Sequence, residues 1–183
     1  MGVLLEEKCG CLYRGYGVAW DCFLACFAHT KGMNYLAHLY LSQPTVDSHY
    51  GNLLGDFRKG VNVAALPFSV QQGLQNHYLV DRFSDSHPEV MAAKQVFPKS
   101  QRRFAPVALD MIFDHFLIKN WSTYSSITFD DFCYRSFNLL REGMPAMPVP
   151  MQRTVSHMIE HHWFNSNASF DGITYAITRV ANS

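Results

Sequence analysis

The chain has 183 residues, of which 48% are hydrophobic and 16% are charged, and its 15 basic residues balance its 15 acidic residues. This composition predicts one folded domain and argues against a disordered chain. The zero net charge argues against a general nucleic-acid-binding protein, and no apolar stretch reaches the roughly 20 residues that cross a membrane.

The first 32 residues differ in composition from the rest of the chain. They contain four of the five cysteines, Cys9, Cys11, Cys22 and Cys26, whereas a disulfide framework would distribute cysteines through the fold. The cysteine spacing is only a weak zinc signal, and acidic residues make the segment a poor signal peptide. We expect residues 1–32 to be an atypical N-terminal extension or to follow a start site assigned too early, and the protein to be cytoplasmic.

From Met33 onward the hydrophobic periodicity predicts successive helices and almost no strands. The expected helices cover residues 34–41, about 45–60 with Thr45 or Asp47 as cap, 67–84 with Ser69 as cap, 88–96 with Pro88 first, 104–121, 129–142, 151–164 and 169–180. A linker is expected at Pro145, Pro148 and Pro150. The prediction is an all-α, single-domain helical bundle over residues 33–183.

Two motifs place carboxylates beside histidines among apolar residues: His77-Tyr-Leu-Val-Asp81 and Asp110-Met-Ile-Phe-Asp114-His115. Residues four apart lie on one face of a helix, so each pair points in one direction. Buried carboxylates are normally paired or bound to a metal ion. Asp110 and Asp114 in particular would repel each other unless a cation or a shared proton compensates their charges.

Several polar positions are therefore candidates for one shared centre: His38, Asp56, His77, Asp81, Asp110 and Asp114, with His115 adjacent. Each alone has a structural interpretation, such as a satisfied core histidine or a solvated surface pair. Together they favour a metal site. Mixed His and Asp ligands suit Mn²⁺, Mg²⁺ or Fe²⁺, and such ions promote phosphoester hydrolysis by polarising the phosphoryl group and activating water.

A second histidine motif, His157-Met-Ile-Glu160-His161, matches the H-x-x-E-H pattern of one class of zinc proteases. That class needs a further acidic ligand downstream, and Asp171 is the only acidic residue after Glu160. We therefore interpret the motif as one helix face. Cys133 has no matching histidine context and is expected to be a small core residue.

The motifs, in this order, resemble the acyl carrier protein phosphodiesterase family. The resemblance covers about residues 33–180. Its matching pieces are Met33–Leu39, Gly51–Phe57, Gly73, His77, Asp81, Asp85, Pro88–Val90, Arg103–Leu117 and Trp121.

This resemblance implies an all-helical fold, divergently related to the His-Asp metal-dependent phosphohydrolases. It implies removal of the 4′-phosphopantetheine group from holo-acyl carrier protein, typically with Mn²⁺, to leave apo-protein with a free serine. Carried over position by position, the expected metal ligands are His38, Asp56, His77, Asp81 and Asp114, and the expected catalytic residues are His115, Asp85 and Asp110. The division between ligands and acid or base groups is our inference. A neighbouring histidine is expected to protonate the leaving serine oxygen.

Two departures from the family pattern leave alternatives open. Gln75 stands where some members have a further histidine, and members usually continue beyond Ser183. The alternatives are a His-Asp-type nucleotide phosphohydrolase and a non-catalytic paralogue that binds the carrier protein. The carrier protein is acidic, so Arg58-Lys59 and Lys99–Arg103 are candidate docking residues.

Overall fold

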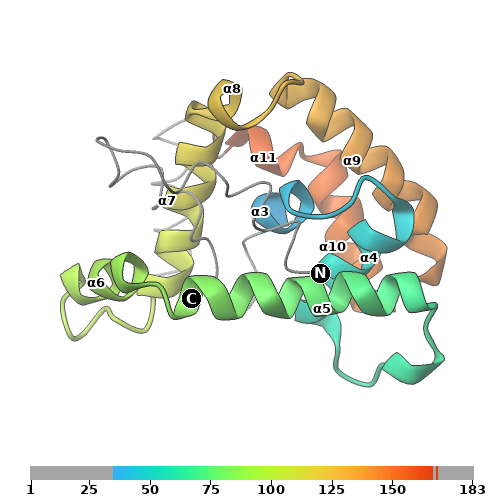
Figure 1. Ribbon diagram of the computed structural model, residues 1–183, viewed down its shortest axis with the longest axis horizontal. Coiled ribbons are helices and arrows are strands. Elements are labelled where there is room, and N and C mark those ends of the chain that lie inside the picture. Colours follow the sequence, from blue (N-terminus) through green and yellow to red (C-terminus); the bar gives the residue numbers. More distant parts are fainter. Residues whose placement is uncertain (1–34, 167, 169–183) are drawn as a thin grey trace.

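Figure 1 shows the computed structural model of the chain, which describes residues 35–166 and residue 168. Within these residues the secondary structure is helical, without strands, so the prediction of an all-α fold is confirmed. The predictions for residues 1–32 and for a helix over 169–180 lie outside the described residues. No helix in the described part of the chain is long and apolar enough to cross a membrane.

Short 3-10 turns (labelled η) separate several of the helices. In chain order the elements are α3 (Tyr35–Tyr40), α4 (Val46–Leu54), η1 (Gly55–Phe57), η2 (Val63–Ala65), α5 (Phe68–Asp85), α6 (Pro88–Val96), α7 (Ala105–Lys119), α8 (Trp121–Tyr124), α9 (Phe129–Gly143), η3 (Met144–Ala146), α10 (Val149–Glu160) and α11 (Trp163–Ser166). The helices expected within the described residues are all present, although three of the expected ranges each span two elements: α4 and η1, α7 and α8, and α10 and α11.

Two expectations about helix ends are corrected. The helix capped by Thr45, whose side chain accepts a hydrogen bond from the backbone N–H of Ser48, ends at Leu54 and tightens into η1 instead of continuing to residue 60. Ser69 is not a helix cap, because Pro67 occupies that position. The Ser69 hydroxyl donates instead to the carboxylate of Asp47, which ties the start of α5 to α4.

Two of the three prolines near residue 148 lie in the short segment that joins α9 to α10, as expected, and the third lies inside α10. Pro145 lies within η3, Pro148 occupies the capping position of α10, and Pro150 lies in the first turn of that helix. The first turn tolerates proline because its N–H groups have no partner within the helix. Pro145 and Pro148 therefore belong to the connection between α9 and α10, and Pro148 and Pro150 also mark the start of α10.

The helices α4 and α5 cross at unusually close range. A Cβ atom placed on Gly73 would lie 2.9 Å from the Cα atom of Gly51 and 2.9 Å from the backbone oxygen of Ser48. Only glycine leaves room for such an approach of two backbones. In Figure 1, α3 lies in the middle of the molecule and α5 runs below it, and α3 also contacts α4 and α7.

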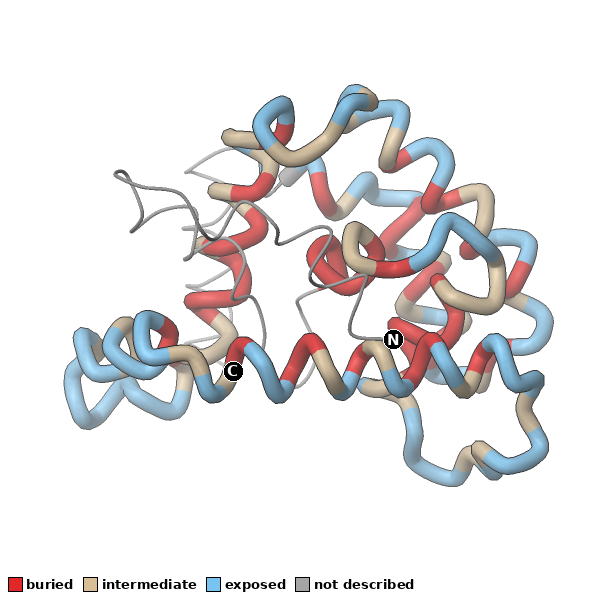
Figure 2. Tube along the Cα trace, in the orientation of Figure 1, coloured by how far each residue is buried: buried red, intermediate tan, exposed pale blue. Residues whose placement is uncertain are grey.

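The buried face of α5 carries polar as well as apolar side chains. Its buried residues are Val70, Gly73, Leu74, His77, Val80, Asp81 and Ser84, and their spacing of three and four marks one helix face. Figure 2 shows these buried turns in red, pointing toward the interior. The main apolar core joins α3 and α4 to α9 and α10, and a smaller cluster joins α3 to α6 and α7. Helix α3 contributes to both clusters, so the segment that carries His38 lies at the centre of the fold.

Candidate metal centre

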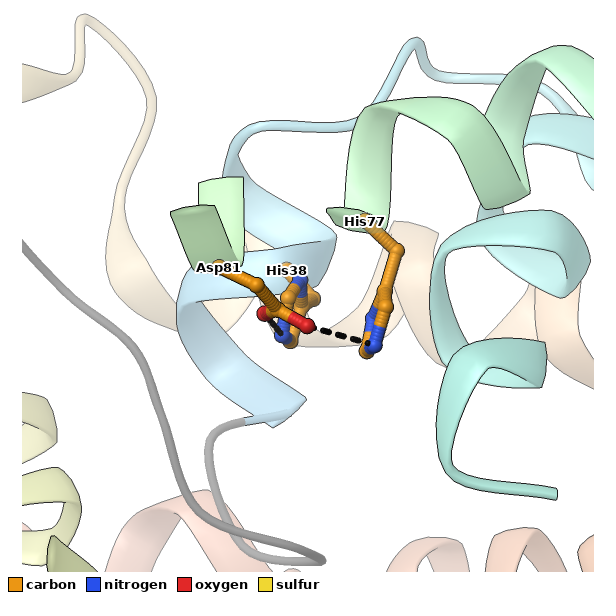
Figure 3. A group of neighbouring side chains, drawn as sticks. All are labelled: His38, His77 and Asp81. Carbon is orange, nitrogen blue, oxygen red and sulfur yellow. Dashed lines mark ion pairs between the residues drawn. The ribbon is translucent and has the colours of Figure 1, made fainter. Parts of the chain in front are cut away.

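Helices α3 and α5 bring two histidines and one aspartate together in the interior. The Nε2 atom of His77 lies 3.0 Å from Oδ2 of Asp81, and the Nε2 atom of His38 lies 3.3 Å from Oδ1 of the same carboxylate (Figure 3). The two imidazole rings are stacked, with centroids 4.2 Å apart. All three residues are at most 5% exposed, so the carboxylate is shared between two buried rings.

A backbone carbonyl fixes the orientation of the His77 ring. The Nδ1 atom of His77 lies 2.8 Å from the backbone oxygen of Asn52. Because a carbonyl oxygen can only accept, Nδ1 carries the proton and donates it. Asn52 lies in the last turn of α4, where carbonyl groups have no regular partner within the helix. The end of α4 thus supplies the acceptor that directs Nε2 of His77 toward Asp81.

This arrangement fits a bound cation. With Nδ1 protonated, a neutral His77 presents the lone pair of Nε2 to Asp81, and an ionised carboxylate is also purely an acceptor. Two acceptors 3.0 Å apart need either a shared proton or a cation to stabilise them. Two ligands bonded to one ion at about 2.0–2.2 Å lie no more than about 4.4 Å apart.

The described residues contain one group of three or more potential ligand side chains whose donor atoms all lie within 4.8 Å of one another, namely His38, His77 and Asp81. Two imidazoles and a carboxylate form a donor set for ions such as Mn²⁺, Fe²⁺ or Zn²⁺. The group can therefore hold a metal ion.

Gly55 lies directly against the His77 ring. A Cβ atom at this position would be 2.0 Å from Nε2 and 2.1 Å from Cδ2 of His77. The backbone of Gly55 has ordinary helical angles, φ −50° and ψ −40°, so the glycine is required by space and not by conformation. The first residue of η1 thus forms one wall of the centre.

The carboxylates of α7 lie in the interior but outside this close group. Asp110 and Asp114 are each 1% exposed, and α7 packs against α3. They are not part of the described group whose donor atoms lie within 4.8 Å of one another. His115 is half-buried, and its ring meets Phe116 edge to face.

Two further expected site residues lie at the surface. Asp56 is exposed on η1, and its charge adds to burial in raising the pKa of Tyr35 above its usual value. Asp85 is 40% exposed and receives a hydrogen bond of 2.8 Å from the Nζ atom of Lys94. The roles expected for these two residues remain predictions.

Sequence reasoning did not assign roles to Asn52, Gly55 or Asn76. The residues Asn52 and Gly55 stand in the segment Gly51-Asn-Leu-Leu-Gly55. An amide side chain within this apolar run is the one feature that could have indicated a buried polar role. Asn76, whose side chain contacts that of Asn52, has no comparable sequence feature apart from its position next to His77.

Three other residues noted in the sequence are not part of the centre. His157 and His161 are both exposed, with ring centroids 4.2 Å apart. Cys133 is buried in the core, as expected, and burial raises the pKa of its thiol to about 12.

Comparison with known proteins adds the family. A family model described as acyl carrier protein phosphodiesterase matches residues 33–183. The chain is 30% identical over 151 residues to an acyl carrier protein phosphodiesterase of Serratia proteamaculans, covering 82% of this chain and 78% of the relative. It is 32% identical over 155 residues to the protein of that name from Escherichia coli O6:H1, with the same coverage. A third relative of that name, from Photorhabdus laumondii, is 43% identical over 97 residues, or 51% of this chain and 49% of the relative. No solved structure matches the chain. With a family model that spans most of its length and relatives of one name across the same region, the chain belongs to the acyl carrier protein phosphodiesterase family.

Proposed function

We propose that this protein hydrolyses the phosphodiester that joins 4′-phosphopantetheine to the serine of holo-acyl carrier protein, and so releases the apo-protein. The observation that carries the proposal is the buried group of His38, His77 and Asp81 in a chain whose relatives are named for phosphodiester cleavage. A buried carboxylate shared by two imidazoles is a costly arrangement for packing alone. A bound cation would offset that cost.

We further propose that this group holds a divalent ion, namely Mn²⁺, with Mg²⁺ and Fe²⁺ as alternatives. When bound, such an ion stabilises negative charge on a phosphoryl oxygen and lowers the pKa of a water molecule toward neutrality. His38, His77 and Asp81 would supply ligand atoms from α3 and α5. Asp56 and Asp114 are proposed as additional ligands on the basis of the family resemblance.

The side chains of α7 are proposed to handle protons. Cleavage adds a water oxygen to phosphorus and breaks the bond from phosphorus to the serine oxygen of the carrier. The departing serine oxygen needs a proton, which we assign to an imidazole nitrogen of His115, a half-buried residue. We assign acceptance of the proton from water to the carboxylate of Asp110, which is 1% exposed. Such proton transfers typically accelerate a reaction by about 10²–10⁴-fold.

The proposed partner is the carrier protein, an acidic molecule of the cytoplasm, and a cytoplasmic location is proposed with it. Arg58 supports this choice of partner. Its Nη1 atom donates a hydrogen bond of 2.9 Å to the hydroxyl of Tyr78, the residue that follows His77. A guanidinium has five N–H donors, so most of them remain available at this exposed site. An oriented cation near the centre would help an acidic protein to dock.

The proposal is tested by incubating the purified protein with holo-acyl carrier protein and Mn²⁺ and measuring the mass of the carrier. The expected result is the loss of one phosphopantetheine group, and no loss with Asp81→Ala. The folded state of the variant is checked by circular dichroism. A parallel incubation with nucleoside mono- and triphosphates covers the nucleotide alternative. Cleavage of nucleotides with an intact carrier would overturn the proposal. Binding of the carrier without cleavage would favour the non-catalytic alternative.

A further inference from the structure

Two asparagines connect the helices that supply the metal centre. The side chain of Asn52 on α4 is completely buried. Its Nδ2 group donates to the backbone oxygen of Ser48 at 2.8 Å, and its Oδ1 atom accepts from Nδ2 of Asn76 on α5 at 2.9 Å. The second hydrogen of Asn76 Nδ2 reaches the backbone oxygen of Leu41, directly after α3, at 3.3 Å. One chain of amide hydrogen bonds thus joins α3, α4 and α5.

This amide chain lies next to the groups that orient His77. Asn52 supplies the side chain that meets Asn76 and also the carbonyl that accepts the proton of His77 Nδ1, at 2.8 Å. Asn76 immediately precedes His77 on α5. A shift of α5 along α4 would therefore break the amide contact and the contact to His77 together. Because the buried amide of Asn52 must satisfy its hydrogen bonds, its contact with the half-buried Asn76 favours one register of the two helices over others.

We propose that Asn52 and Asn76 are positioning residues for the metal centre. They hold α5 and the end of α3 against α4, so that His77 keeps its Nδ1 proton on the Asn52 carbonyl while the Nε2 atoms of His38 and His77 converge on Asp81. The side chains of Asn52 and Asn76 hydrogen-bond to each other and to the backbone oxygens of Ser48 and Leu41, so both act on the centre through the position of His77. The proposal rests on the metal site of the proposed function, and neither readout of its test requires turnover.

The test compares Asn52→Ala, Asn76→Ala and the double variant with the parent protein. The first readout is the tautomer of His77, from long-range ¹⁵N–¹H correlation spectra of the metal-free protein, with the signal assigned by its absence in His77→Gln. The second is the Mn²⁺ dissociation constant from calorimetry. Replacing outer partners of ligating histidines typically weakens metal affinity by about 10–100-fold. We expect a weakening in this range for each single variant, and little additional loss in the double variant because the residues act as one unit.

Two control variants separate positioning from general stability. Gln75→Ala changes the exposed neighbour of Asn76 on the same helix. Val70→Ala removes buried volume from the same face of α5, two turns before His77. We expect both controls to keep the His77 tautomer and the Mn²⁺ affinity, although Val70→Ala lowers the melting temperature.

The outcomes distinguish this proposal from the proposed function. An altered His77 tautomer in the asparagine variants, with both controls unchanged, supports the positioning role even if the carrier protein is never cleaved. If Val70→Ala weakens Mn²⁺ binding as much as Asn76→Ala at equal loss of stability, the asparagines have only a structural role and the proposal is wrong. An unchanged tautomer together with unchanged Mn²⁺ affinity in Asn76→Ala also overturns it.

Discussion

At the scale of single residues, Gly55 is the most sensitive position beside the metal centre. An added methyl group would lie 2.0 Å from Nε2 of His77, far inside contact distance. Because the backbone of Gly55 is helical, alanine is conformationally acceptable there, and only the clash with the ring opposes it. We predict that Gly55→Ala displaces the His77 ring and weakens Mn²⁺ binding by about tenfold or more. Calorimetric titration with Mn²⁺ measures the effect.

A matched control for Gly55→Ala is Gly143→Ala at the end of α9. A Cβ atom there would lie 2.9 Å from the Cγ1 atom of Val46 and 3.5 Å from the Cε atom of Met147, which are both side-chain atoms. Gly143→Ala is therefore expected to lower stability modestly and to leave Mn²⁺ affinity unchanged. Equal affinities for the two variants would show that Gly55 does not shape the centre.

The two aspartates at the end of α5 are predicted to differ sharply in their effects. The side chain of Asp81 is 7% exposed and contacts both histidines, whereas the side chain of Asp85 is 40% exposed and contacts Lys94. We predict that Asp81→Asn abolishes Mn²⁺ binding and turnover. Asp85→Asn should change the free energy of unfolding by less than about 1 kcal/mol, the usual value of an exposed ion pair. Urea unfolding and turnover are measured for both. Loss of turnover in Asp85→Asn without loss of stability would support the catalytic role that the family resemblance implies.

Residue types and spacing were sufficient to predict that His77 and Asp81 share a helix face, and that His38 is a candidate for the same centre. Spacing could not predict that His38 reaches Asp81, because that contact depends on how α3 crosses α5. Nor could it predict the exposure of Asp56. The periodic pattern continues past Gly55, while the backbone changes there from the α to the 3-10 geometry, which alters the direction of every following side chain.

At the scale of helices, the crossing of α4 and α5 sets the position of His77. Gly51 and Gly73 meet one turn before His77, and a Cβ atom at Gly73 would lie 2.9 Å from Cα of Gly51. We predict that Gly73→Ala separates the two helices and lowers the free energy of unfolding by about 1–3 kcal/mol, as overpacking of close contacts does. It should also weaken Mn²⁺ binding, because the carbonyl of Asn52 moves away from His77. Urea unfolding and Mn²⁺ titration of one sample measure both effects.

The outcome for Gly73→Ala that would contradict this account is a loss of stability with full Mn²⁺ affinity. The helix crossing would then stabilise the fold without adjusting the centre.

Hydrophobic periodicity was sufficient to predict both helices. The residue type and position of Thr45 were sufficient to predict that it caps α4. The close crossing of α4 and α5 could not be predicted. A glycine within a helical pattern indicates that another segment approaches closely, but the sequence does not show which segment it is.

At the scale of the whole molecule, a 51-residue stretch from Tyr35 to Asp85 contains the closely grouped potential ligands, and α7 carries two further buried carboxylates. The sequence motifs predicted both contributions, but not how far apart they lie. Helix α3 belongs to both apolar clusters and contacts α4 and α7. A substrate phosphate handled by groups from both sides would therefore lie near α3. This placement follows from packing between distant segments, which single-sequence patterns do not encode.

The docking of an acidic carrier protein gives a prediction for the molecular surface. Arg58 is exposed and held by Tyr78, beside the metal centre. Reversing its charge with Arg58→Glu should raise KM for the carrier protein by roughly an order of magnitude, since surface charges act mainly on the rate of encounter, and leave kcat nearly unchanged. The control is Arg135→Glu, an exposed change of equal charge on α9, which α4 separates from α5.

A second candidate docking region lies before α7, where Arg102 donates to the backbone oxygen of Phe97 and Arg103 lies over the ring of Phe104. The double reversal Arg102→Glu and Arg103→Glu tests whether this region also contacts the carrier.

Electrostatic docking should weaken as salt rises, because the screening length falls from about 10 Å at 0.1 M to about 3 Å at 1 M. KM for the parent protein should therefore rise with salt, and KM for the affected variant should rise less. A small phosphodiester substrate should be cleaved equally by all of these proteins. If KM for the carrier is unchanged in Arg58→Glu and in the double variant, the carrier docks elsewhere on the surface.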